Sequence, residues 1–111
     1  MNNLFLDILK KENLVTQIST TNPRFTVWNN IVMKIQLLHT VSEDKAVLYV
    51  TESRGINPYC YRTSLIESIS YKDDIITVKT RNSVYKFMIK DSLKLSPTEL
   101  KFNSYIEEYD N

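Results

Sequence analysis

The feature that most constrains the fold of this chain is a long alternation of apolar and polar side chains over residues 31–41. Successive side chains of a β-strand point to opposite faces of its sheet, so this alternation indicates a strand with one buried face. The side chains predicted to form the buried face are Ile31, Met33, Ile35, Leu37, His39 and Val41.

Further segments carry a strand signal, at residues 14–19, 46–51, 59–71, 75–80 and 83–90. β-Branched and aromatic residues, which pack well on a pleated surface, are frequent in them. Polar turns join these segments as hairpins, and in the last turn Asn82 is suited to a positive φ. We also expect residues 24–28 to be extended, and we expect the chain to bend near Ser64.

A short helix is predicted over residues 3–13, where Asn2 or Asn3 can cap the first turn. Apolar residues recur there at the i, i+3 and i+4 spacing of a helix that buries one face. The residues of this stripe are Leu4, Phe5, Ile8 and Leu9.

A second helix is predicted over residues 97–109. Ser96 and Glu99 have the spacing of a capping box, and Pro97 falls at the first helical position, where proline is favoured. The face of this helix that we expect to contact a partner or a second copy consists of Phe102, Tyr105, Ile106 and Tyr109.

These elements predict a single globular domain over residues 1–111. Hairpin connections without intervening helices exclude a doubly wound parallel sheet. We therefore expect an α+β, mainly β protein with about six antiparallel strands. The strands are expected to form a curved sheet or a small open barrel, flanked by one N-terminal and one C-terminal helix.

The composition narrows the classes of function. Fourteen basic and thirteen acidic residues give a net charge of +1, so any basic surface must be local. One cysteine excludes a disulfide within the chain, and no apolar run approaches the length of a membrane span. We expect a cytoplasmic protein without a membrane partner. The abundance of residues with AT-rich codons suggests an AT-rich genome, such as that of a low-GC bacterium, its phage or a mobile element.

Groups for catalysis or metal binding are sparse. His39, the only histidine, falls on the apolar face, where a packing role is the alternative to a general base. The acid pairs Glu43-Asp44 and Asp73-Asp74 fall in predicted turns, where acids are common. A single glycine cannot build a phosphate-binding loop. We therefore expect no catalytic residues, no metal and no cofactor.

Residues 54–62 are the most unusual segment, because they hold the only glycine, Gly55, and the only cysteine, Cys60. Strand alternation separates Cys60 from the tyrosines on either side of it, which favours a contact surface over a reactive thiol. Arginine and tyrosine are enriched in interface hot spots. The predicted contact residues are Arg54, Tyr59, Tyr61, Arg62 and Arg81.

The leading interpretation is a small non-enzymatic protein-interaction module that binds, and thereby inhibits, a host protein. The alternative is a nucleic-acid-binding small barrel, in which bases stack on tyrosines and cations contact phosphates. The additional residues of that surface would be Tyr71, Tyr85, Lys79 and Lys86. An enzyme of unknown class is the third interpretation, and a homodimer is compatible with each of them.

Overall fold

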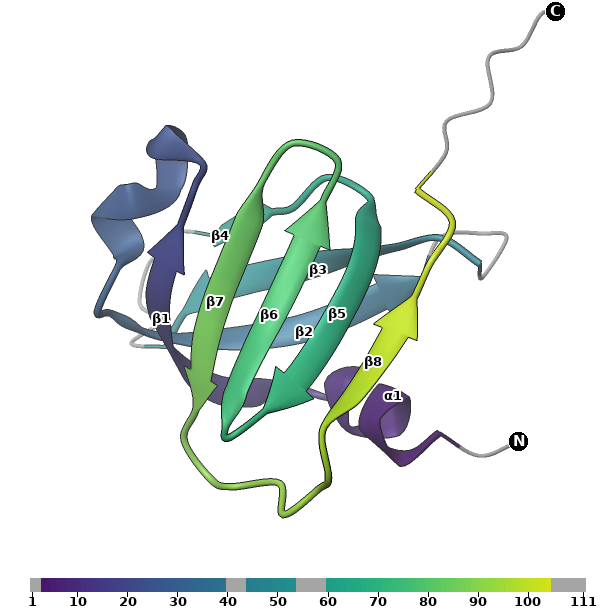
Figure 1. Ribbon diagram of the computed structural model, residues 1–111. Helices are drawn as coiled ribbons and strands as arrows, with labels where there is room; N and C mark the ends of the chain where they lie inside the picture. The colour runs from purple at the N-terminus through teal and green to yellow at the C-terminus, as the bar shows by residue number, and fades with distance from the viewer. Residues whose placement is uncertain (1–2, 40–43, 54–59, 105–111) are drawn as a thin grey trace, which may run out of the picture.

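The computed structural model of the protein describes residues 3–39, 44–53 and 60–104. Figure 1 shows its elements, which are helix α1 and the 3-10 helix η1 together with eight strands. In chain order they are α1 Leu4–Leu9, β1 Asn13–Thr20, η1 Pro23–Trp28, β2 Val32–His39, β3 Ala46–Glu52, β4 Cys60–Arg62, β5 Ile66–Lys72, β6 Ile75–Thr80, β7 Val84–Ile89 and β8 Thr98–Lys101.

Within the described residues, the strands form one open antiparallel sheet in the order β4-β3-β2-β1-β7-β6-β5-β8. The predicted mainly β fold is confirmed, with eight strands in place of about six. One extra strand arises because the chain bends at Ser64, as expected, and so divides the 59–71 segment into β4 and β5. The other is β8, which lies where a helix was predicted.

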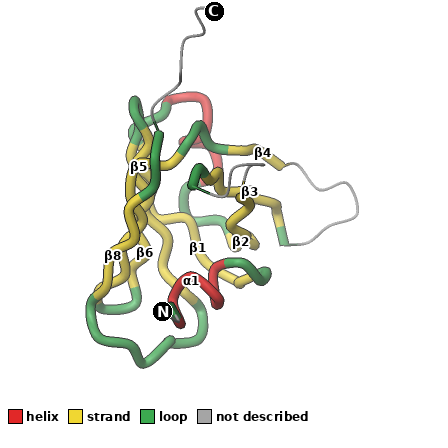
Figure 2. The backbone as a smooth tube through the Cα atoms, turned by 90° about the vertical axis from the view of Figure 1, so that its right-hand side faces the viewer, coloured by secondary structure: helices red, strands yellow, loops and turns green. Residues whose placement is uncertain are grey.

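Strand β1 connects the two halves of the sheet. Its residues 13–16 pair with β2, whereas its residues 15–20 pair with β7, and the second pairing shifts register between Gln17 and Ser19. An irregularity of this kind bends a strand and increases its twist. The sheet consequently folds into two layers, with β2, β3 and β4 in one and β5, β6 and β8 in the other (Figure 2).

The core lies between these layers. Strand alternation directs Met33, Ile35 and Leu37 into it from β2, as the sequence predicted, and each is at most 2% exposed. Helix α1 lies between the layers at one end (Figure 2) and inserts Phe5 and Leu9. Full burial of such a side chain contributes about 1.5–3 kcal/mol. The remaining buried apolar residues include Val15, Leu48, Val50, Ile66, Ile69, Ile76, Val78 and Phe87.

The last strand approaches the opposite layer just beyond its end. The backbone N–H of Asn103 donates to the carbonyl oxygen of Asp44 at 2.9 Å, and its side-chain amide donates to the Asp44 carboxylate at 3.3 Å. Asp44 lies two residues before β3, so these bonds join the chain after β8 to the start of the other layer. They hold the two layers together although the sheet itself stays open.

The predicted helix over residues 97–109 is wrong where the structure describes it. Thr98–Lys101 is instead strand β8, which pairs with β5. Pairing gives the backbone of β8 hydrogen-bond partners and packs the half-buried Leu100 and Phe102 against the core. Because an isolated helix of this length is marginal in water, the capping signal does not outweigh these contacts. Residues 105–109 lie outside the described residues.

Three smaller expectations also need correction. The segment predicted to be extended at residues 24–28 is the 3-10 helix η1, capped by the Asn22 side chain, which accepts from the Arg24 N–H at 3.0 Å. Helix α1 is shorter than the predicted 3–13. Positive φ values occur at Asp73 and Asp74, at 53° and 65°, and not at Asn82.

No helix in the described part of the chain is long and apolar enough to cross a bilayer.

Candidate interaction surface

The structure separates the residues predicted as contacts. Arg54 and Tyr59 lie outside the described residues. Tyr61 and Arg62 are neighbours on β4, but Tyr61 is buried and Arg62 is exposed, because they point to opposite faces. Arg81 is exposed in the turn between β6 and β7. Arg62 and Arg81 thus remain available for contact, whereas Tyr61 does not.

Tyr61 belongs to a buried cluster beneath η1. Its hydroxyl donates to Gln17 Oε1 at 2.6 Å, and its ring stacks on Phe25 with centroids 4.0 Å apart. The Gln17 amide in turn donates to the Phe25 carbonyl at 2.9 Å and to Asn29 Oδ1 at 3.0 Å. Burial, reinforced by the nearby Tyr85, raises the pKa of Tyr61 well above its ordinary value. Tyr61 is therefore a structural residue.

The other tyrosines proposed for stacking on bases are also inside. Tyr71 is 3% exposed, and its hydroxyl donates to the Asp74 carboxylate at 2.8 Å. Tyr85 is 2% exposed, and its hydroxyl accepts from the Asn22 amide at 3.3 Å. The surface of interleaved rings and cations that the sequence suggested is therefore not formed by these residues.

A different group of side chains lies together on the outer face of β1, β2, β3 and β4. Tyr49, Leu38 and Leu14 are 40%, 38% and 38% exposed, although they alternate with buried core residues. In the described residues no helix covers this face, since α1 and η1 lie between the layers (Figure 2). We call it the Tyr49 face, and it consists of Leu14, Val32, Lys34, Gln36, Leu38, Val47, Tyr49, Thr51 and Arg62.

Strand register makes the Tyr49 face continuous. Tyr49 is the register partner of both Arg62 on β4 and Gln36 on β2. One row along the strands, Leu38 is opposite Val47. Side chains directly opposite one another have Cβ atoms about 4.5–5.5 Å apart, so each row forms a contiguous strip.

The Tyr49 face carries charge of one sign. Lys34 and Arg62 are its charged members, and no carboxylate belongs to it. Tyrosine and arginine supply much of the binding energy in protein interfaces, especially when apolar side chains surround them and exclude water. The Tyr49 face thus combines a Tyr-Arg pair with adjacent leucine and valine side chains.

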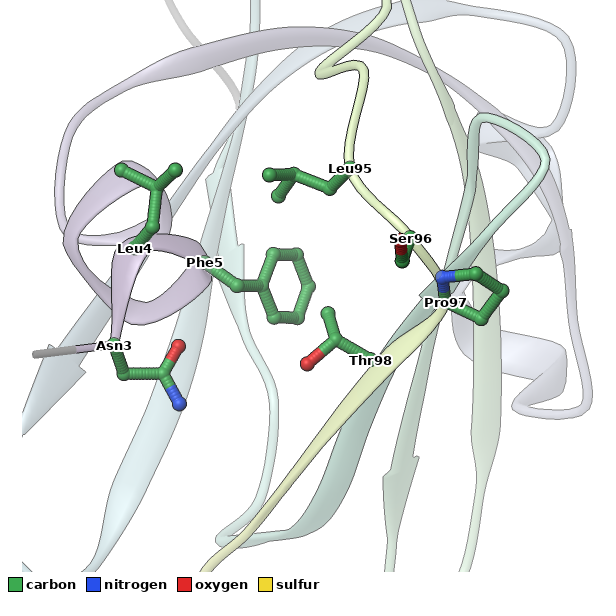
Figure 3. Close-up of a pocket in the computed structure, with 7 residues that line it drawn as sticks. All are labelled: Asn3, Leu4, Phe5, Leu95, Ser96, Pro97 and Thr98. Carbon is green, nitrogen blue, oxygen red and sulfur yellow. The ribbon is translucent and has the colours of Figure 1, made fainter.

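The structure also contains a surface pocket of about 430 Å³ between α1 and the segment before β8. Figure 3 shows the Phe5 ring pointing from α1 towards this segment, and Leu95 pointing back towards the helix. The pocket is lined by Asn3, Leu4, Phe5, Leu95, Ser96, Pro97 and Thr98. None of these side chains titrates near neutral pH, so the pocket offers no acid, base or nucleophile of ordinary reactivity.

The structure also shows the surroundings of His39 and of the other groups considered for catalysis or metal binding. The half-buried His39 ring packs against Phe102, with centroids 6.1 Å apart and planes tilted by 54°. This packing also directs Phe102 towards the protein's own sheet, whereas the rest of the predicted dimer face, Tyr105, Ile106 and Tyr109, lies outside the described residues. Within the described residues, no three His, Cys, Asp or Glu side chains are placed to hold a metal ion.

Sequence reasoning missed the Tyr49 face, although a signal for it was present. The strand over residues 31–41 has Val32 and Leu38 on its outward side, and the next strand has Val47 and Tyr49 in equivalent positions. Large apolar residues at outward positions of two paired strands indicate a surface that is covered by something else.

Comparison with protein-family models, with curated proteins and with solved structures found no match for this chain.

Proposed function

We propose that this protein is a small non-enzymatic interaction module that binds another protein through the Tyr49 face. The observation that supports this most directly is that the exposed Arg62 and Tyr49 lie in register beside Leu38 and Val47. The half-buried Gln36 completes the strip, and its amide donates to the Lys10 carbonyl oxygen at 2.9 Å. Such a strip can form the centre of an interface, where a few aromatic and arginine anchors carry most of the affinity.

The charges of the face define the kind of partner. Lys34 and Arg62 are positive and have no acidic neighbour within the Tyr49 face. A complementary partner surface therefore carries carboxylates around an apolar centre, because complementary charges accelerate encounter and disfavour wrong partners.

Composition alone supports the proposed origin and role of the module. A compact chain from an AT-rich genome suits an accessory protein of a phage or a mobile element. In this proposal it acts in the host cytoplasm and inhibits a host protein by occupying that protein's acidic surface.

The proposal is tested by affinity capture from a lysate of a low-GC bacterial host, with capture repeated for two variants. The double variant Tyr49→Ser/Arg62→Glu removes the anchor pair. The control variant is Leu4→Ser, which alters an apolar residue on α1 whose side chain is 58% exposed. We expect one acidic protein to be retained by the wild type and by Leu4→Ser, and to be lost with the double variant. Equal retention of every captured protein by all three would refute the role of the Tyr49 face.

A further inference from the structure

The opposite layer presents a second surface of different chemistry. Lys72, Lys79, Lys86 and Lys101 are all exposed, and each belongs to a different strand among β5, β6, β7 and β8. They alternate with buried residues such as Tyr71, Val78 and Phe87, so they project outward from one side of the sheet. This side faces the viewer in Figure 1, and no described helix covers it. We call it the lysine face and define it by these four lysines with Ser68, Ser70 and Thr77.

Register places hydroxyl groups between the lysines. Ser68 is the partner of Lys79 on one side and of Lys101 on the other. Thr77 is likewise the partner of both Lys86 and Ser70. With strands about 4.8 Å apart, Lys79 and Lys101 have backbones about 10 Å apart, and a short serine lies between them. Short hydroxyl side chains therefore lie between the longer lysine side chains on this face.

The positive charge of this face is a local excess. Glu99 lies in the row of Ser70, and Glu67 lies at the irregularity beside Ser68. On the sheet face itself, four lysines against these two carboxylates leave a positive excess, with Asp73 and Asp74 beyond it in the turn after Lys72, although the whole chain has a net charge of only +1. A concentrated patch of this kind attracts polyanions, and it loses that attraction as salt increases.

The side chains of the lysine face indicate which kind of polyanion would fit it. Its outward positions carry no aromatic ring, because Tyr71, Tyr85 and Phe87 point into the core. Single-stranded nucleic acid is usually held by stacking bases on such rings, whereas in a duplex the bases are already stacked on one another. A membrane surface would need an apolar patch to insert. Ile75 and Met88 lie in the row of Lys72, but of the two only Met88 is well exposed, at 48%.

We propose that the lysine face binds the phosphate backbone of double-stranded nucleic acid without reading the base sequence. Lysine ammonium groups and serine and threonine hydroxyls are common donors to phosphate oxygens, and such contacts fix position without selecting bases. This inference is independent of the Tyr49 face, because the two surfaces are on opposite sides of the molecule (Figure 2).

The test measures fluorescence anisotropy of a labelled mixed-sequence DNA duplex of about 20 base pairs across a salt series, because each neutralised phosphate contributes about −0.9 to the slope of log K against log salt. With up to four contacts we expect a slope of about −3 to −4. Lys79→Gln and Lys86→Gln should each reduce its magnitude by about 1, and Glu99→Gln should strengthen binding. The control Lys34→Gln, on the Tyr49 face, should change neither the affinity for the duplex nor the slope of log K against log salt.

Several results would overturn the proposal. They are no binding to the duplex at low salt, an equal loss with Lys34→Gln, or tighter binding to a single-stranded thymidine oligomer than to the duplex. Binding to phosphatidylserine vesicles in place of DNA would also overturn it. Circular dichroism confirms that each variant is folded. The capture experiment on the Tyr49 face gives a separate answer, so either proposal can fail while the other stands.

Discussion

The Tyr61 hydroxyl donates to Gln17 Oε1 at 2.6 Å across the interior of the sheet. The two residues belong to β4 and β1, which are separated by β3 and β2 in the strand order. The bond can form only because the sheet curves, bringing the edge strand back over the strand that joins the two layers. A buried polar pair of this kind fixes one arrangement of the core, since an unpaired partner would be costly.

This pair should be energetically coupled. We expect Gln17→Leu and Tyr61→Phe each to lower the free energy of unfolding by about 1–3 kcal/mol, because each leaves a buried polar group without its partner. The double variant should cost less than the sum, by about 0.5–3 kcal/mol. Urea unfolding of the four proteins measures this coupling, and strict additivity would show that the bond contributes nothing of its own.

Alkaline pH should destabilise the protein through Tyr61. Burial raises the pKa of its phenol in the folded state, so between pH 10 and that raised value the folded protein binds more protons than the unfolded chain. This contribution to stability is complete below the unfolded pKa and falls as pH rises above about 10, by up to about 1.4 kcal/mol per pH unit. Unfolding at several alkaline pH values should show a shallower decline for Tyr61→Phe. Leu4→Ser, which removes no ionisable group, should retain the wild-type decline.

Helix α1 should contribute to stability through one face only. Phe5→Ala removes a ring that is 2% exposed and lies 6.0 Å from the Tyr71 ring, so we expect a loss of about 3–5 kcal/mol. Leu4→Ala, one residue earlier and 58% exposed, should change stability by less than about 0.5 kcal/mol. Thermal or urea unfolding distinguishes the two, and similar losses would mean that α1 does not pack as described.

The turn between β5 and β6 should favour residues that accept a left-handed backbone. Asp73 and Asp74 have φ values of 53° and 65°, as in the two-residue turns that match strand twist. Asp73→Val should therefore lower the free energy of unfolding by about 1–2 kcal/mol, whereas Asp73→Gly should preserve or raise it. In contrast, Asp74→Gly should be destabilising, because Asp74 accepts the Tyr71 hydroxyl at 2.8 Å. Urea unfolding of the three variants tests this order.

The hairpins could be predicted from sequence because their signals are local. The alternation around Ile35, the bend at Ser64 and the hairpin turn at Asp73 depend on residues that are close in the chain. Strand β8 could not be predicted in this way, because it exists through pairing with the edge of β5. An alternation of Thr98, Leu100 and Phe102 was nevertheless present beneath the stronger capping signal of Ser96 and Glu99.

The candidate surface was predictable in kind but not in place. Strand alternation places Arg62 and its neighbouring Tyr61 on opposite faces, yet alternation alone does not say which of the two faces is inside. The answer depends on Gln17, an acceptor 44 residues away in sequence, which draws Tyr61 into the core. The position of Tyr49 also depends on residues distant in sequence, because the pairing of β3 with β2 and β4 places Gln36 and Arg62 on either side of it.

An open sheet always leaves two rows of backbone amides and carbonyls that a neighbouring chain could extend into a fibre. Here the edge strands β4 and β8 are the shortest of the sheet, with three and four residues. Pro97, which has no N–H to donate, directly precedes β8. Each edge is thus too short to pair stably with the edge of another copy. The short edge strands protect this open sheet from aggregation, whereas a closed barrel is protected because it has no edges.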